Sequence, residues 1–202
     1  MYNSVMIKNI FPYIFVAAVV GTSVFYYQKL RYEGKPLENF PAPEEIVQKT
    51  IDTVTEGNGV EDFSNRGLTE FPLVVLNRTD TVVLNLSDNN IPSLPSEIGK
   101  LVNLQEFYIA RSHLRSLPGE IRLFTKLRIL DLHDNNLSGI PAEIGQLPAI
   151  EKIDLSDNRI TDLPNELFTL GHLDELNLTG NPIDEEKITE LKTKLPNTEV
   201  IF

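Results

Sequence analysis

Apolar residues recur with a fixed period of 23 residues along the last two thirds of the chain. The period is seen at two sets of positions, Pro72, Pro95, Pro118, Pro141 and Pro164, and Leu84, Phe107, Leu130, Ile153 and Leu176. Within a unit a polar residue stands between two apolar ones, as in Leu84, Asn85 and Leu86. This alternation predicts a short strand, because successive side chains of a strand point to opposite faces. One unit cannot bury its own apolar stripe, so the units are expected to stack into a solenoid.

An asparagine follows the strand in four of the units, at Asn89, Asn135, Asn158 and Asn181, and Ser112 takes its place in another. A side-chain amide can hydrogen-bond the backbone groups of neighbouring coils, which a buried turn requires. Ser112 is expected to supply part of that bonding. The apolar residues after each proline are expected to form the outer wall.

Three units read LNLSDNNIPSLPSEIGKL, LDLHDNNLSGIPAEIGQL and IDLSDNRITDLPNELFTL. This pattern resembles the leucine-rich-repeat family, LxxLxLxxNxLxxLPxxIxxL, over residues 60 to about 183, and is similar to its intracellular plant Ras-group and Scribble-type class. The resemblance implies an α/β solenoid with a curved parallel sheet on the concave face and a helical or irregular convex face. It also implies that the chain binds proteins and is not an enzyme.

Both ends of the repeat array are expected to be covered. At the front, Glu61 stands where other units have an apolar residue, which suggests a terminal unit with a more polar outer face, and the apolar spacing of residues 46–54 predicts a short helix that shields it. At the back, Asp184 is the expected N-cap of a helix, with Ile183 and Ile188 as a hydrophobic staple. Residues 199–202 are expected to add a last strand.

Residues 10–27 contain no charged side chain. As a helix this segment would rise roughly 27 Å, against a hydrocarbon core of about 30 Å, which predicts one transmembrane helix. A cleaved signal peptide is the alternative interpretation. The domain organisation expected is an anchor over residues 1–33, a linker and capping helix over 34–59, the repeats over 60–183, and a C-terminal capping helix and tail over 184–202.

Basic residues follow the apolar segment at Lys29, Arg31 and Lys35, which favours a single-pass membrane protein with its repeats in the cytosol. A short, moderately apolar anchor followed by basic residues resembles the signal anchors of mitochondrial outer-membrane receptors. A mitochondrial membrane is therefore one candidate location.

Composition narrows the function classes. The chain has no cysteine, which excludes disulfides, thiolate nucleophiles and zinc-thiolate sites. Its net charge is −11, and residues 60–202 carry 13 basic and 23 acidic side chains, so a nucleic-acid partner is disfavoured. No glycine-rich phosphate loop, GxSxG or HExxH motif is present, and no cofactor is expected.

An acidic cluster is predicted on the strand face. Adjacent strands lie about 4.8 Å apart, which brings neighbouring units close together. The cluster is expected to comprise Asp131, His133, Asp134, Asp154 and Asp157. Such a set could bind a divalent metal or act in acid–base catalysis, could be a solvated face without a role, or could dock a basic segment of a protein partner. Docking is favoured, because a flat ladder points its side chains in parallel and does not aim them at one metal ion.

One unit departs from the others and reads FYIARSHLRSLP. Its Tyr108 and Arg111 interrupt the acidic surface, and both residue types are enriched at binding hot spots. We expect Tyr108 and Arg111 to anchor a partner that the acidic cluster orients, with neutral drift as the alternative. The predicted function is thus a membrane-anchored adaptor or scaffold. The alternative is a structural accessory subunit of a large membrane complex, with a mitochondrial complex as one candidate, and a metal-dependent enzyme is a third hypothesis.

Overall fold

The computed structural model describes residues 9–10, 13–19, 25–31 and 59–202. The chain divides into two compact units, residues 1–57 and 58–202, which are described separately. The second unit contains the repeats.

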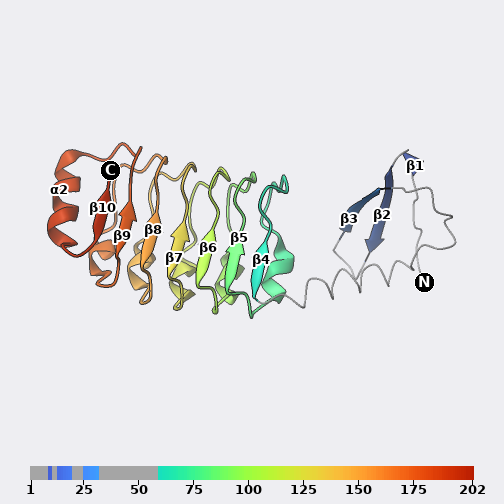
Figure 1. Ribbon diagram of the computed structural model, residues 1–202, viewed down its shortest axis with the longest axis horizontal. Coiled ribbons are helices and arrows are strands. Elements are labelled where there is room, and N and C mark those ends of the chain that lie inside the picture. The colour runs from blue at the N-terminus through green and yellow to red at the C-terminus, as the bar shows by residue number, and fades with distance from the viewer. Residues whose placement is uncertain (1–8, 11–12, 20–24, 32–58) are drawn as a thin grey trace. The chain divides into compact units, whose positions relative to one another are not determined.

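A parallel sheet of seven strands runs through the second unit in the order of the sequence (Figure 1). The strands are β4 Val60–Asp62, β5 Val83–Asn85, β6 Glu106–Tyr108, β7 Ile129–Asp131, β8 Lys152–Asp154, β9 Glu175–Asn177 and β10 Glu199–Ile201. The 23-residue period becomes the pairing register, because Leu84 lies opposite Phe107 and Phe107 opposite Leu130. The predicted solenoid with a parallel sheet is confirmed.

The wall opposite the sheet consists of short 3-10 helices, one in each of five successive coils. They are η2 Leu73–Asn77, η3 Ser96–Lys100, η4 Gly119–Leu123, η5 Ala142–Gln146 and η6 Asn165–Thr169. The periodic prolines stand directly before them, in extended conformation, at the N-cap position. Each helix buries one aliphatic residue at its third position, such as Ile98 or Ile144. Proline thus ends the extended segment at a fixed point, and a single turn is enough to return the chain to the core.

The core lies between these two walls. The central residue of each inner strand is buried, and Leu84, Phe107 and Leu176 are fully so. Phe107 packs edge-on against Phe124, with 6.3 Å between the ring centres and an interplanar angle of 85°. This contact joins the sheet to the wall of 3-10 helices within the same coil.

Asparagine side chains connect the coils as expected. The amide nitrogen of Asn135 donates to the carbonyl of Ile109 in the preceding coil at 2.8 Å and to that of Leu132 in its own coil at 2.9 Å. Its amide oxygen accepts from the backbone of Ser112 and Leu114, at 3.1 and 2.8 Å. Ser112 is fully buried, and its hydroxyl donates to Leu86 at 3.0 Å. The prediction that Ser112 supplies part of the hydrogen bonding that asparagine gives in other coils is confirmed.

The front of the solenoid differs from the prediction at Glu61. This residue pairs in register with Leu84 and is only 7% exposed, so the polar group faces the interior rather than the outside. Arg78 neutralises it through an ion pair between two buried side chains. The predicted helix over residues 46–54 lies outside the described residues.

The back of the solenoid contains the expected helix and last strand. Helix α2 Glu185–Lys194 begins after Asp184, which occupies the N-cap position without a capping hydrogen bond from its side chain. Leu191 and Leu195 are buried, and Ile183 packs against the core. Strand β10 then pairs in parallel with β9 and extends the sheet.

The first unit contains strands where a membrane helix was expected. They are β1 Asn9–Ile10, β2 Tyr13–Val19 and β3 Phe25–Arg31, and β2 pairs with β3 in antiparallel register. Valine, isoleucine, phenylalanine and tyrosine dominate this stretch, and these residue types favour strands. Within the described ranges, no helix combines the length and the apolar character needed to cross a membrane.

The buried pair at the front allows a test. Replacing Arg78 with methionine should destabilise the protein by about 3–5 kcal/mol, because the Glu61 carboxylate would remain buried without its counter-charge. The double variant Arg78→Met with Glu61→Leu, which restores the residue type of the other units, should recover most of that loss. Urea unfolding of the full chain measures both. Equal destabilisation of the single and double variants would refute the interpretation.

Candidate functional site

The outward side chains of the sheet form two rows that cross the strands. We call this surface the sheet face. The outer row starts the strands and contains Val60, Val83, Glu106, Ile129, Lys152, Glu175 and Glu199. The central row ends them and contains Asp62, Asn85, Tyr108, Asp131, Asp154, Asn177 and Ile201. The residues between these rows point inward, towards the core. The strand register therefore shows which side chains lie on the face.

The carboxylates of the central row already perform a structural task. Asp154 accepts from the backbone N–H of Ser156 at 2.8 Å, and Asp131 accepts from that of His133 at 3.1 Å. Asn85 and Asn177 make the same bond to the residue two positions later. These are Asx turns, which bend the chain as it leaves each strand.

Tyr108 interrupts this series, because its side chain has no oxygen that can close such a turn. The backbone N–H of Ala110 donates instead to the hydroxyl of Ser87 in the preceding coil, at 3.1 Å. The tyrosine is therefore tolerated because its neighbour supplies the missing acceptor.

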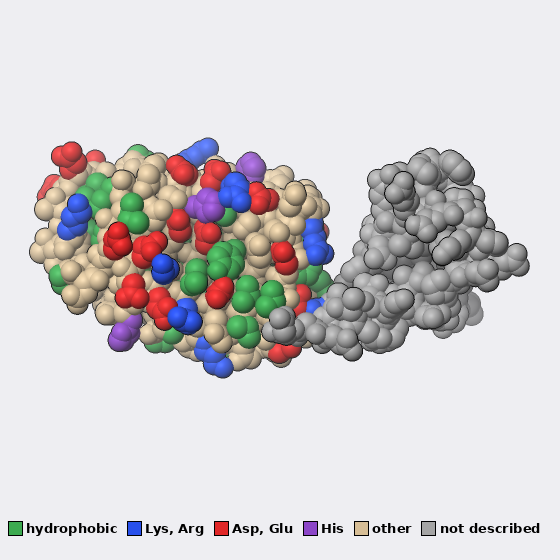
Figure 2. Space-filling model, in the orientation of Figure 1, with side chains coloured by type: hydrophobic (Ala, Val, Ile, Leu, Met, Phe, Trp, Pro, Cys, Tyr) green, Lys and Arg blue, Asp and Glu red, His purple; other side chains and the backbone are tan. Residues whose placement is uncertain are grey.

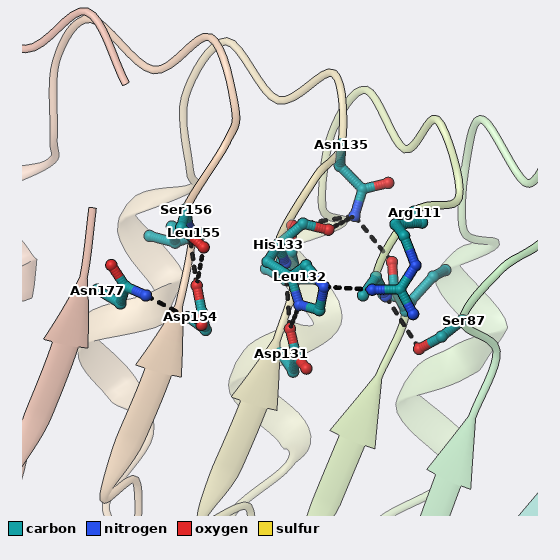
Figure 3. A network of polar contacts seen from close by, with 12 residues as sticks. Ser87, Arg111, Asp131, Leu132, His133, Asn135, Asp154, Leu155, Ser156 and Asn177 are labelled. Atoms are coloured by element: carbon teal, nitrogen blue, oxygen red, sulfur yellow. Dashed lines mark hydrogen bonds and ion pairs between the residues drawn. The ribbon is translucent and has the colours of Figure 1, made fainter. Parts of the chain in front are cut away.

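Arg111 and His133 lie in one polar chain (Figure 3). The guanidinium donates to both oxygens of Asp88, at 2.6 and 2.9 Å, and another of its nitrogens contacts Nε2 of His133. Arginine has only donors, so Nε2 must accept, and Nδ1–H of His133 donates to Asp131 at 2.7 Å. In this arrangement Arg111 is held by residues on both sides.

The ion pair between Arg111 and Asp88 shifts the pKa of both groups. The hydrogen bond from Arg111 holds the pKa of Asp88 below its ordinary value, and the same bond raises the pKa of Arg111. Asp88 was absent from the predicted site, although it stands one period before Arg111 in the sequence.

The predicted acidic cluster separates into two groups. Potential ligand atoms of Asp131, His133 and Asp154 lie within 4.8 Å of one another. Asp134 and Asp157 stand apart in left-handed turns, with φ of 52° and 53°, and both are exposed. Neither carboxylate has a hydrogen-bond or ion-pair partner within residues 59–202. The two groups therefore differ in how much charge they can offer a ligand.

A metal ion would have to compete for the first group. Asp131 and His133 bond each other, Arg111 occupies the remaining nitrogen of His133, and Asp154 accepts from Ser156 and Asn177. A nearby guanidinium also opposes a second cation. The donor set therefore fits a polar network better than a metal centre.

Tyr108 shares the sheet face with two apolar residues, Val83 and Ile129, that were not included in the predicted site. Its hydroxyl donates to Glu106 at 2.8 Å, and Val83 and Ile129 lie in the outer row of the adjacent strands. Figure 2 shows hydrophobic side chains gathered over the middle strands with acidic ones around them. Burial and the Glu106 hydrogen bond raise the pKa of Tyr108 to about 12. Val83 and Ile129 could have been found from the repeat register, since both occupy an outward position.

A shallow, open depression of about 530 Å³ lies near the starts of the middle strands. Lys126, Arg128, Glu151 and His172 contribute to its lining. Arg128 and Glu151 form an ion pair at 2.7 Å, so much of its charge is internally balanced.

Comparisons with known proteins place the repeats in one class. Leucine-rich-repeat family models match residues 81–101 and residues 125–183. The comparison with curated proteins found no match.

Among solved structures, the Leptospira interrogans LRR protein LIC12759 is 30% identical with a TM-score of 0.57, covering 67% of this chain and 40% of that one. The LRR ectodomain of the Arabidopsis thaliana membrane receptor kinase GASSHO1/SCHENGEN3, solved in complex with CASPARIAN STRIP INTEGRITY FACTOR 2, is 37% identical with a TM-score of 0.53. It covers 56% of this chain, which spans 14% of that ectodomain. The chain thus spans less than half the length of either structure.

Titration of Tyr108 tests its contact with Glu106. The folded-state pKa of about 12 lies above the ordinary value of 10.0, so the tyrosine contributes stability that is fully present below pH 10 and is lost as the pH rises towards 12. The tyrosinate absorbance of the full chain minus that of Tyr108→Phe should show this late midpoint. Glu106→Gln should lower the midpoint in part, because burial remains. A midpoint near 10 would contradict the contact.

Proposed function

We propose that this chain, which its matched repeats support as a member of the leucine-rich-repeat family, binds a protein partner on the sheet face. The observation that carries the proposal is the row of outward, ordered side chains that runs unbroken across seven strands. A surface of this kind is typical of repeat proteins, whose extended faces bind other chains.

The composition of the face supports binding. Tyr108 is oriented by its bond to Glu106, and Val83 and Ile129 stand on either side of Glu106 in the outer row. A partly buried aromatic side chain with its hydroxyl already engaged loses little entropy when a partner covers it. Aromatic residues of this kind commonly dominate binding energy.

The comparisons support the same class of function. The GASSHO1/SCHENGEN3 ectodomain was solved in a complex, and by analogy the shared architecture suits this chain to hold a protein ligand. Proteins of this family are typically non-catalytic interaction modules, and we propose that role as adaptor or scaffold. The proposal assigns Tyr108, Arg111, Asp131, His133, Asp134, Asp154 and Asp157 to the binding surface.

Their roles within that surface differ. Arg111, Asp131, His133 and Asp154 are engaged with one another or with their own turns, so we propose that they support the surface. Tyr108, Asp134 and Asp157 are the better candidates for direct contact. A net excess of acidic groups in residues 60–202 favours a partner with a basic segment.

A variant of the sheet face tests this function. Full-length protein carrying Tyr108→Ala with Ile129→Ser should lose the partners that the unmodified protein captures from its native cells, because the apolar contact area is removed. The matched control is Val102→Ser with Leu123→Ser, which removes exposed apolar groups away from the face, 46% and 39% exposed. Quantitative mass spectrometry compares the captured proteins. Unchanged capture by the face variant, or equal loss in the control, would overturn the proposal.

Location is a separate proposal that rests on the sequence. The uncharged residues 10–27 and the basic residues that follow support attachment to a membrane, with the repeats on the cytosolic side and a mitochondrial membrane as one candidate. Carbonate extraction of the full chain should leave it in the membrane fraction, and deletion of residues 10–27 should release it. Extraction of the intact chain into the soluble fraction would refute the attachment.

The alternative role, an accessory subunit fixed in a membrane complex, predicts a different assembly state. Native gels of solubilised membranes would then show the chain only in a large species. A free pool that matches the total amount of protein would exclude the subunit role and leave the adaptor proposal standing.

A further inference from the structure

The sheet face is divided along its length into an apolar part and an acidic part. In the outer row, Val60 and Val83 precede Glu106 and Ile129, whereas Lys152 and two glutamates follow. Val60 is 45% exposed, and Val83, Tyr108 and Ile129 are half-buried. A ligand that removes the remaining surface of such side chains from water stabilises its complex with the protein. The apolar part therefore lies over β4 to β7.

The acidic part begins where the apolar part ends. Asp134 and Asp157 follow β7 and β8, lie 23 residues apart and so occupy neighbouring coils. Their counterpart in an earlier coil, Asp88, forms an ion pair with Arg111. Arg111 also attracts Asp134 at longer range, but neither Asp134 nor Asp157 forms an ion pair or a hydrogen bond among residues 59–202. Two adjacent like charges repel each other, and a cation that approaches both relieves the repulsion.

Most of the remaining carboxylates of the face are less able to bind a cation, and the exception, Glu199, lies at the far end of the sheet on β10. Asp131 and Asp154 close turns and accept further hydrogen bonds, and Glu175 forms an ion pair with Lys152 at 2.9 Å. Pairing with a ligand would disturb those bonds. Glu106, between Val83 and Ile129, accepts the hydroxyl of Tyr108, so the unbonded charge beside the apolar part lies at Asp134 and Asp157.

The spacing of the two parts fits an extended chain. From β5 to β8 the sheet spans three strand separations, or about 14 Å, and an extended peptide rises about 3.3 Å per residue with alternate side chains on one face. Asp157 also lies five residues further along its coil than Lys152, the β8 residue in register with Val83, so the path between them is diagonal and spans roughly 20 Å. Roughly seven residues therefore connect Val83 to Asp157, with four side chains directed at the sheet.

We infer that the partner segment is an extended, basic polypeptide. Two of its apolar side chains stand at alternate positions, and a lysine or arginine stands at the next alternate position before or after them. The apolar pair covers Val83, Tyr108 and Ile129, and the basic side chain lies between Asp134 and Asp157. This inference rests on the proposed function and specifies the chemistry of its ligand. A second copy of this chain fits less well, because each copy carries a charge of −11.

Fluorescence anisotropy with the full-length protein tests the inference. The probe is a short fluorescein-labelled peptide with leucine and phenylalanine at alternate positions and arginine at the next two alternate positions, separated by serines. A peptide of the same composition, with the arginines placed between the apolar residues, should bind several-fold more weakly. Asp134→Asn with Asp157→Asn should weaken the first peptide about tenfold at low salt, and the difference should shrink at high salt.

The charge control is Glu120→Gln with Glu143→Gln, which removes the same two charges from the opposite wall, also one period apart. Its affinity should equal that of the unmodified protein. The inference is overturned if the two peptides bind equally, if the Asp134 and Asp157 variant binds normally, or if the control weakens binding to the same extent. If no peptide binds while partner capture still depends on Tyr108 and Ile129, the inferred ligand is wrong and the proposed function stands.

Discussion

Each coil of this solenoid buries backbone groups that only a neighbouring coil can satisfy. Asn158 shows the constraint, since its amide nitrogen donates to Leu132 in one coil and to Leu155 in the next, at 2.9 and 3.0 Å. A buried carbonyl or N–H without a partner costs roughly 1–3 kcal/mol, so a coil is stable only in the stack. The period of 23 residues follows, because an insertion would move each asparagine away from both carbonyls.

The same constraint limits what the sheet face can offer a partner. Asp131 and Asp154 look like free carboxylates in the sequence, but they close the turns that lead each strand into the buried asparagine loop. Charges that are not needed for the turns remain at Asp134 and Asp157, one step outside the strands. Few outward positions are therefore left free by backbone bonding, and Ser87 allows Tyr108 to be one of them.

Predictions from the sequence failed where a contact did not follow the period. Glu61 was expected to be part of a polar end, but Arg78, 17 residues later and outside the repeat register, brings its counter-charge into the interior. The prediction of a membrane helix in the first unit differs from the structure for another reason. Residues 10–27 combine strand-favouring side chains with the apolar length of a membrane helix, and local pattern alone does not decide between these two structures.

The sequence by itself determined the stacking of the coils, the strand positions, the buried asparagines and the outward row that contains Tyr108 and Asp131. Each of these depends on a spacing that repeats, and the alternation of a strand converts spacing directly into direction. Only the tertiary structure decided which polar groups on that row are already paired. Arg111 reaches both Asp88 and His133 across adjacent coils, and the pairing depends on side-chain length and rotamer, which a periodic pattern does not encode.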